Sequence, residues 1–453
     1  MFVDLRPFFQ LRHHVAERGA VSLVGAALDR ALSPAGATVF TNVFAHAARA
    51  EAEAVDRRHA AGVRIGPLAG IPVSVKDLFD VAGQVTRAGS TVLADGAPAE
   101  HDAPAIARLR AAGAVIVGHT NMTEFAFSGL GLNPHFGTPA NPWDKDRIPG
   151  GSSSGAAVSV ALGMAAAAIG TDTGGSVRIP AAFCGLAGFK PSAARTDTRG
   201  TVPLSKSLDT VGPIAHGITD CALLDAFLAG GDQPHLETAG IAGLRFAVPQ
   251  TYVLDDLDSE VAHAFDRALA ALSAAGVRLV EVPFAEWAKL PDLLAGGGLV
   301  AAESYAWHRR RLEAAADRYD PRVRVRIERG RAMSAADYVD LLELRAARIR
   351  ETQAAFAPFD AVVMPTVACV APKIADLADD DAYTRANLRA LRNTTVANLL
   401  DLPAATLPIQ TPGNLPVGLS LVGATGGDRR LLDVAAGVEV ALCAAGLGRA
   451  LAQ

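Results

Sequence analysis

The stretch that decides the fold of this chain is GGSSSGAAVSVALGMAAAAIGTDTGGS, residues 150–176. A serine–glycine cluster stands at each end, and small apolar residues fill the middle. A helix over Gly155–Ala165 would be roughly 16 Å long, and an extended return over Ala166–Asp172 would cover about 23 Å. The stretch therefore predicts a helix followed by a strand, which together bring Ser152 and Ser176 to the same place.

Outside this stretch, strand and helix patterns alternate along the chain. The segment up to about Ala61 reads as helices, because five apolar residues form one stripe at helical spacing: Phe40, Val43, Phe44, Ala47 and Ala48. Strand patterns lie at 73–75, 114–117, 244–248, 277–282, 361–364, 405–407 and 417–422, and helical patterns at 103–112, 259–275 and 428–445. This alternation predicts a mixed, mostly parallel sheet covered by helices on both faces.

The number of domains is the next question. A chain of 453 residues exceeds the length at which single cores usually stop growing, and the glycine-rich segment 230–234 is a candidate boundary. Strand patterns continue at the same spacing on both sides of that segment. We therefore expect a single α/β domain over residues 1–453, with a helical elaboration at about 285–350.

Composition excludes several classes of function. The net charge of −5 argues against a nucleic-acid-binding surface, and the arginine-rich segment 309–350 reads as helices with a solvated basic face. The four cysteines are scattered without metal-site spacing, as expected for a reducing compartment. The longest apolar run, Ala156–Ile169, is too short to span a bilayer. We expect a soluble cytoplasmic protein without a metal or membrane anchor.

Ser176 has the surroundings of a nucleophile. The preceding glycines allow a sharp turn whose consecutive N–H groups can hold an oxyanion. A serine hydroxyl needs a base, and none of the 11 histidines lies in either cluster. Lys76 follows the buried strand pattern Ile71–Val75, so desolvation is expected to lower its pKa. Ser152 could then relay a proton between Lys76 and Ser176.

Other interpretations of these residues remain. Gly151-x-Ser153-x-Gly155 matches a nucleophile elbow, but that motif needs a strand directly before it, and Asn141–Pro149 reads as a loop. A phosphate-binding loop would need Gly-Lys-Ser/Thr, which neither cluster has. A Gly/Ser run is often a flexible loop, and a lysine at a strand end is often a surface residue. Spacing alone leaves the Ser–Ser–Lys site a hypothesis.

Several segments together resemble the amidase signature family. They are 150–155, 170–185, the lysine segment Pro67–Asp77, Asn121–Phe125, Phe189–Pro191, Asn398–Ala404 and Pro416–Leu419. The resemblance covers about 40 to 440 and is densest in a core of about 66–213. It implies a single α/β domain with a large mixed sheet. The chain departs from the family pattern at His119, where lysine is frequent, and at Ser192–Arg195.

The resemblance also implies a role for each matching residue. Ser176 matches the nucleophile, Ser152 the bridging serine that follows a cis peptide bond in the family, and Lys76 the general base. The N–H groups of the oxyanion hole match Thr173, Gly174, Gly175 and Ser176, and the supporting positions match Ser153, Asp172 and Arg178. The implied reaction is hydrolysis of a carboxamide through an acyl-enzyme, with no cofactor. Loop residues Phe125, Phe127 and Phe136 are candidates for contact with the acyl group.

Three alternatives stay open beside a stand-alone amidase that acts on a small-molecule amide. One is the glutaminase (A-type) subunit of a tRNA-dependent amidotransferase, which would need partner subunits. Another is a urea-derivative hydrolase of the allophanate or carboxybiuret type. The third, a non-catalytic scaffold that kept the fold, is disfavoured by the intact Lys76, Ser152 and Ser176. A homodimer is compatible with each of these interpretations.

Overall fold

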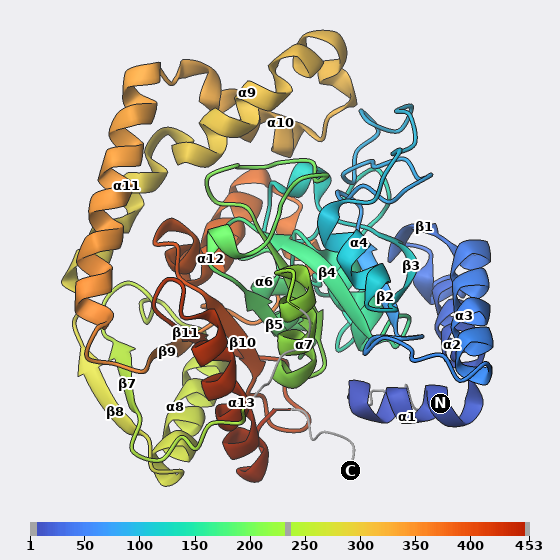
Figure 1. The fold of residues 1–453 in the computed structure, drawn as a ribbon. Coiled ribbons are helices and arrows are strands. Elements are labelled where there is room, and N and C mark those ends of the chain that lie inside the picture. Colours follow the sequence, from blue (N-terminus) through green and yellow to red (C-terminus); the bar gives the residue numbers. More distant parts are fainter. Residues whose placement is uncertain (1–6, 232–236, 449–453) are drawn as a thin grey trace.

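The computed structural model describes residues 7–231 and 237–448, which form one domain around an 11-stranded sheet (Figure 1). The order of the strands is β1-β3-β2-β4-β6-β5-β10-β11-β9-β7-β8. The strands are β1 (Phe40–Val43), β2 (Pro72–Lys76), β3 (Val115–Thr120), β4 (Ala167–Asp172), β5 (Ala187–Lys190), β6 (Thr210–Ala215), β7 (Arg245–Pro249), β8 (Arg278–Val282), β9 (Ala361–Pro365), β10 (Ala404–Pro408) and β11 (Gly418–Val422).

Helices cover both faces of this sheet. In the middle of the sheet, α7 and α13 pack together on one face, and α6 and α12 lie on the other (Figure 1). The helices are α1 (Phe8–Arg18), α2 (Ala20–Ala31), α3 (Ala45–Ala60), α4 (Pro104–Ala111), α5 (Ser154–Ala161), α6 (Arg178–Cys184), α7 (Ile218–Leu228), α8 (Ser259–Ala274), α9 (Gly298–Ala315), α10 (Pro321–Glu328), α11 (Ala335–Phe356), α12 (Asp380–Leu399) and α13 (Asp428–Ala444). The expected mixed α/β architecture is confirmed.

The pairing of the strands corrects one part of the expectation. Parallel pairs join β3, β2 and β4 at one end and β9, β7 and β8 at the other. The centre is antiparallel from β4 through β6, β5, β10 and β11 to β9. Neither β5 nor β6 was predicted, since β5 has only four residues and β6 carries Gly212-Pro213, a pair that normally argues against a central strand. The sheet is therefore mixed but not mostly parallel.

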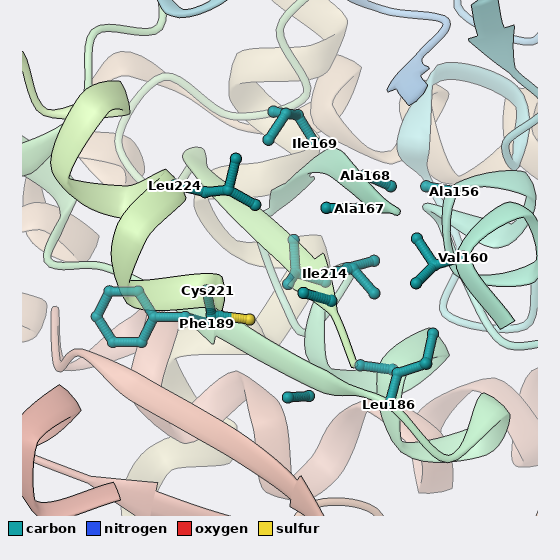
Figure 2. Close-up of a cluster of buried hydrophobic side chains, with 14 of the residues drawn as sticks. Ala156, Val160, Ala167, Ala168, Ile169, Leu186, Phe189, Ile214, Cys221 and Leu224 are labelled. Carbon is teal, nitrogen blue, oxygen red and sulfur yellow. The ribbon is translucent and has the colours of Figure 1, made fainter. Parts of the chain in front are cut away.

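The helix-and-strand unit predicted from residues 150–176 is present as α5 and β4. Figure 2 shows Ala168 of β4 beside Ala156 and Val160 of α5, and Leu224 of α7 beyond the sheet. Helix α5 also lies close to the segment before β1, where only glycine fits: a Cβ at Gly155 would lie 2.2 Å from the Val39 carbonyl oxygen. The small apolar run is thus buried core that joins the two serine clusters.

The N-terminal prediction was partly wrong. The segments before residue 32 and after residue 44 are helical, but Phe40–Val43 is the edge strand β1, antiparallel to β3. The prediction failed because β1 is only four residues long and is followed at once by α3. The apolar residues of such a strand and helix have the same spacing in the sequence as the stripe of one continuous helix. Of the candidate boundary at 230–234, residues 232–234 lie outside the described residues.

The helical elaboration expected at about 285–350 is present. It consists of a 3-10 segment, Ala285–Gly297, followed by α9, α10 and α11. In Figure 1, α9 and α10 lie across the top of the molecule and α11 runs down its left side. Within residues 7–231 and 237–448, none of the helices combines the length and apolar character needed to cross a bilayer.

Candidate active site

Lys76 lies at the carboxyl end of β2, between β3 and β4 in the sheet, and none of its side chain is exposed. Its Nζ donates hydrogen bonds to Ser152 Oγ at 2.7 Å and to Thr171 Oγ1 at 2.9 Å. Burial lowers the pKa of Lys76 to about 7, although the negative charges of Asp209 and Asp172 act to raise it. The amine can therefore be neutral, and act as a base, near neutral pH.

The two serine clusters meet as the sequence predicted. The Ser153 N–H donates to the Ser176 carbonyl oxygen at 3.2 Å, and both Ser152 and Ser176 are buried. The peptide bond between Gly151 and Ser152 is cis. The Ser152 carbonyl accepts a hydrogen bond from the Thr123 N–H at 3.1 Å. Ser152 is thus hydrogen-bonded to Lys76 and Thr123, and the residue that follows it is hydrogen-bonded to Ser176.

The turn before Ser176 has the geometry that glycine permits. Gly175 has φ of 136°, and a Cβ there would lie 2.2 Å from Thr394 Oγ1. The Gly174 carbonyl accepts hydrogen bonds from Thr394 Oγ1 at 2.6 Å and Thr395 Oγ1 at 3.2 Å. Helix α12 thus fixes the carbonyl side of this turn from a position about 220 residues away along the chain.

Asp172 and Arg178 form a fully buried ion pair behind the turn. Arg178 donates from Nε and Nη2 to the two carboxylate oxygens, each at 2.9 Å. Asn398 donates to Asp172 Oδ1 at 2.9 Å and accepts from Arg178 Nη2 at 2.7 Å. Burial opposes ionisation of Asp172, but the Arg178 charge and these hydrogen bonds outweigh it and lower the pKa of Asp172 to about 2. The pair ties β4 to the start of α6 and so holds both ends of the Ser176 turn.

Ser153 precedes α5, and its hydroxyl is buried without a hydrogen-bond partner among the described residues. Its contribution to the site is therefore the backbone N–H that holds Ser176, together with the packing of its side chain under Gly170: a Cβ on that glycine would lie 2.6 Å from Ser153 Oγ.

The three candidate phenylalanines differ in their surroundings. Phe125 is 1% exposed and packs edge-on against His308 and beside Tyr319, with ring centroids 4.3 and 5.3 Å away. Phe127 and Phe136 are partly exposed. Phe125 thus packs the 125–143 loop against the helical elaboration. Contact of any of the three phenylalanines with an acyl group stays a prediction.

Sequence reasoning missed several side chains that the fold brings to the site. Thr171 lies inside the stretch that was singled out, directly before Asp172, and Asn398 opens one of the matched family segments. Asp209 and Thr394 had no local signal, because their partners Thr173 and Gly174 are distant in sequence. Because strand β6, which begins at Thr210, was not predicted, the sequence did not place Asp209 near the end of β4.

His119, which departs from the family pattern, is a buried structural residue. Its Nε2 lies 3.0 Å from the Phe79 carbonyl oxygen, and burial lowers its pKa to about 4. Among residues 7–231 and 237–448, no cluster of three or more His, Cys, Asp or Glu side chains is arranged to hold a metal ion.

Known proteins resemble this chain over most of its length. The family model described as Amidase matches residues 22–432. The chain is 39% identical to 2-amino-5-chloromuconic acid deaminase of Comamonas testosteroni over 89% of this chain and 88% of the relative. It is 36% identical to the A-type subunit of the glutamyl-tRNA(Gln) amidotransferase of Roseiflexus sp. (strain RS-1), over 87% of each.

A solved structure gives the same result for the fold. The crystal structure of an amidase superposes with a TM-score of 0.85 at 33% identity, covering 94% of this chain and 98% of that one. The family match extends from before β1 to within α13, so it takes in every strand of the sheet. The chain therefore belongs to the amidase family and is an enzyme that hydrolyses amide C–N bonds.

Proposed function

We propose that the enzyme cleaves a carboxamide through an acyl-enzyme on Ser176, with Ser152 as proton relay and Lys76 as general base. The observation that carries this proposal is the buried Lys76 Nζ donating to Ser152 Oγ at 2.7 Å, in a cluster whose next residue holds Ser176 by its backbone. A buried amine with a pKa near 7 and a hydroxyl partner is suited to receive a serine proton.

In the first half-reaction, Ser176 Oγ attacks the carbonyl carbon as its proton passes to Ser152 and the Ser152 proton passes to neutral Lys76. The negative oxygen of the tetrahedral intermediate is held by the N–H groups of Thr173, Gly174, Gly175 and Ser176. The C–N bond then breaks, and the leaving nitrogen takes a proton from Ser152, which regains one from Lys76. Water repeats these steps on the ester, giving a carboxylic acid and restoring Ser176.

Ser153, Asp172 and Arg178 support this machinery without touching the substrate. The buried ion pair fixes the strand and helix that flank the turn, and the Ser153 N–H fixes the Ser176 carbonyl. We assign these functions to the core of about 66–213, with the elaboration at 285–350 as a further part of the single domain of residues 1–453.

The nature of the leaving group is inferred from the relatives. The deaminase name of the Comamonas relative supports ammonia as the leaving group. The amidotransferase relatives favour glutamine as a second candidate substrate, used in a complex with partner subunits.

One assay separates these candidates. The purified chain alone is given primary amides, glutamine, allophanate and 2-amino-5-chloromuconic acid, and ammonia release is measured. We expect turnover of a small primary amide by the chain alone. Glutamine turnover that requires the other proteins of an amidotransferase would replace the stand-alone amidase with the glutaminase interpretation, and release from allophanate alone would select the urea-derivative hydrolase.

A second assay tests the assignment of the nucleophile. A sulfonyl fluoride that inactivates serine hydrolases is added, and the modified peptide is identified by mass spectrometry. The label should be on Ser176 and should be slowed by a competing amide. A label on Ser152 or Ser153 would contradict the mechanism, even if amide hydrolysis itself were confirmed.

A further inference from the structure

A carboxylate that the sequence did not single out is hydrogen-bonded to the glycine turn and acts electrostatically on the proposed base. Asp209 stands directly before β6, whose first residue, Thr210, is paired with Asp172 at the end of β4. Its Oδ1 accepts a hydrogen bond from Thr173 Oγ1, at the start of the glycine turn that leads to Ser176. Asp209 also exerts the largest of the electrostatic interactions that act on the Lys76 ammonium.

The charges of two carboxylates, Asp209 and Asp172, act to raise the pKa of Lys76, and the two differ in how their own charge is compensated. The Asp172 charge is matched by the bidentate Arg178. Asp209 has no arginine partner within the part of the chain that the structure describes; its carboxylate accepts instead from neutral donors, Thr173 Oγ1 and the N–H groups of Leu204 and Ser205. Burial raises the pKa of Asp209 to about 6, and the charge of Lys76 acts to lower it. The Asp209 charge therefore acts on the proposed base without a competing cation.

The loop that presents Asp209 is held from outside by the helical elaboration. Glu303 of α9 accepts hydrogen bonds from Ser205 Oγ at 2.8 Å and from the Ser207 N–H at 2.9 Å. Tyr338 of α11 donates to the same glutamate at 2.8 Å. The elaboration thus fixes residues 204–209 and, through them, Thr173.

We propose that Asp209 is a positioning residue for amide hydrolysis: it anchors the oxyanion turn through Thr173 and holds the ammonium form of Lys76 after proton transfer. This inference rests on the proposed function of Lys76 and Ser176. When Lys76 takes a proton, its new positive charge is buried, and a facing carboxylate stabilises that charge. Asp209 does not exchange a proton with the substrate.

Asp209→Asn tests both parts of the role. The variant loses the charge and places an amide N–H₂ where two backbone N–H groups need an acceptor. We expect kcat to fall by about 10- to 100-fold. The acid limb of the pH profile of kcat/KM should also move to lower pH by about one unit, because loss of a negative neighbour favours neutral Lys76. If Asp209 had only a structural role, the substitution would lower the amount of active enzyme, counted by covalent labelling of Ser176, and the acid limb would not move.

Two further variants separate charge from anchoring. Thr173→Val breaks the hydrogen bond but keeps the charge, so kcat should fall about tenfold while the acid limb and KM stay in place. Glu303→Gln loosens the same loop from α9 without changing the charge of Asp209. Its kcat should fall by about threefold, less than in Thr173→Val, and the acid limb should stay in place.

Two results would overturn this role of Asp209. One is an acid limb of Asp209→Asn that coincides with the wild-type limb. The other is an unchanged kcat in Thr173→Val, which counts even if Asp209→Asn fails to fold. Failure of the underlying mechanism is distinguishable, since a Lys76→Met enzyme with a wild-type rate and profile would remove the base itself.

Discussion

Two regions of the sheet each bury a lysine at the end of a strand, and only one of them has the contacts of a base. Lys76 ends β2 and Lys190 ends β5; neither is more than 1% exposed. Burial lowers the pKa of Lys76 to about 7 and that of Lys190 to about 8, and the Arg178 charge contributes to the lower pKa of Lys190. By desolvation alone, the two lysines are nearly equivalent.

Their hydrogen-bond partners separate them. Lys76 donates to two hydroxyls, and one belongs to the cluster that touches Ser176. Lys190 donates to the carbonyl oxygen of Pro191 at 2.6 Å, which can accept a hydrogen bond but has no proton to give. A lowered lysine pKa therefore indicates a candidate base only where the hydrogen-bond partner of the amine can itself transfer a proton, as a hydroxyl can. Variants of the two lysines and of the residues around them test this difference.

The largest effect is expected from removal of the nucleophile. Ser176→Ala should reduce amide turnover by about 10⁴- to 10⁶-fold, because no acyl-enzyme can form. Thermal unfolding should be nearly unchanged, since one buried hydroxyl is lost. Substantial turnover by a folded Ser176→Ala enzyme would mean that the contacts around Lys76 lead to a different nucleophile.

Matched variants of the two lysines test the comparison directly. Lys76→Met should lower kcat by about 10³- to 10⁴-fold, because the proton of Ser176 loses its acceptor. Lys190→Met, of equal size and burial, should keep kcat within about threefold. The two variants are assayed with the same amide after their folded fractions are matched by circular dichroism. Equal losses of kcat would show that burial, and not the hydroxyl partners, defines the active lysine.

The ion pair near both lysines should contribute stability more than chemistry. Asp172→Asn leaves Arg178 buried without a counter-charge and should lower the free energy of unfolding by about 3–5 kcal/mol. The folded pKa of Asp172, about 2, lies below its ordinary 3.8. Its stabilising effect is therefore fully present at neutral pH and is lost as pH falls from about 4 through 2. Denaturant unfolding of both proteins at pH 7 measures the difference, and a loss below about 1 kcal/mol would contradict it.

The pH dependence sharpens the assignment of Lys76. The neutral amine is the reactive form, so kcat/KM should reach a plateau above about pH 7 and fall about tenfold per unit below it. Lys190→Met should show the same limb as the wild type. If the limb moved in Lys190→Met, the titration would belong to Lys190, and its assignment to Lys76 would be wrong.

The smallest effect concerns the second hydroxyl at Lys76. Thr171→Val removes the partner at 2.9 Å but keeps Ser152, and it should lower kcat about fivefold, the worth of one hydrogen bond. Ser152→Ala serves as the contrast and should cost at least about a hundredfold more. Equal losses would indicate that both hydroxyls carry the proton.

Local patterns predicted the site well where the partners are close in sequence or repeat a strand pattern. The small apolar run fixed α5 and β4, and therefore the meeting of the two serine clusters. The same approach failed at β1, β5 and β6. The first two are too short to show an alternation of apolar and polar residues, and β6 contains a Gly-Pro pair that interrupts it.

By itself, the sequence determined that Ser152 and Ser176 meet and that Lys76 ends a buried strand, because helix length, strand length and apolar alternation are properties of contiguous residues. Only the tertiary structure decided that Lys76 faces Ser152 while Lys190 faces a carbonyl, and that Thr394, Asn398 and Asp209 hold the turn at Ser176. Those contacts join segments up to 226 residues apart. They depend on strand order and packing, which no local pattern encodes.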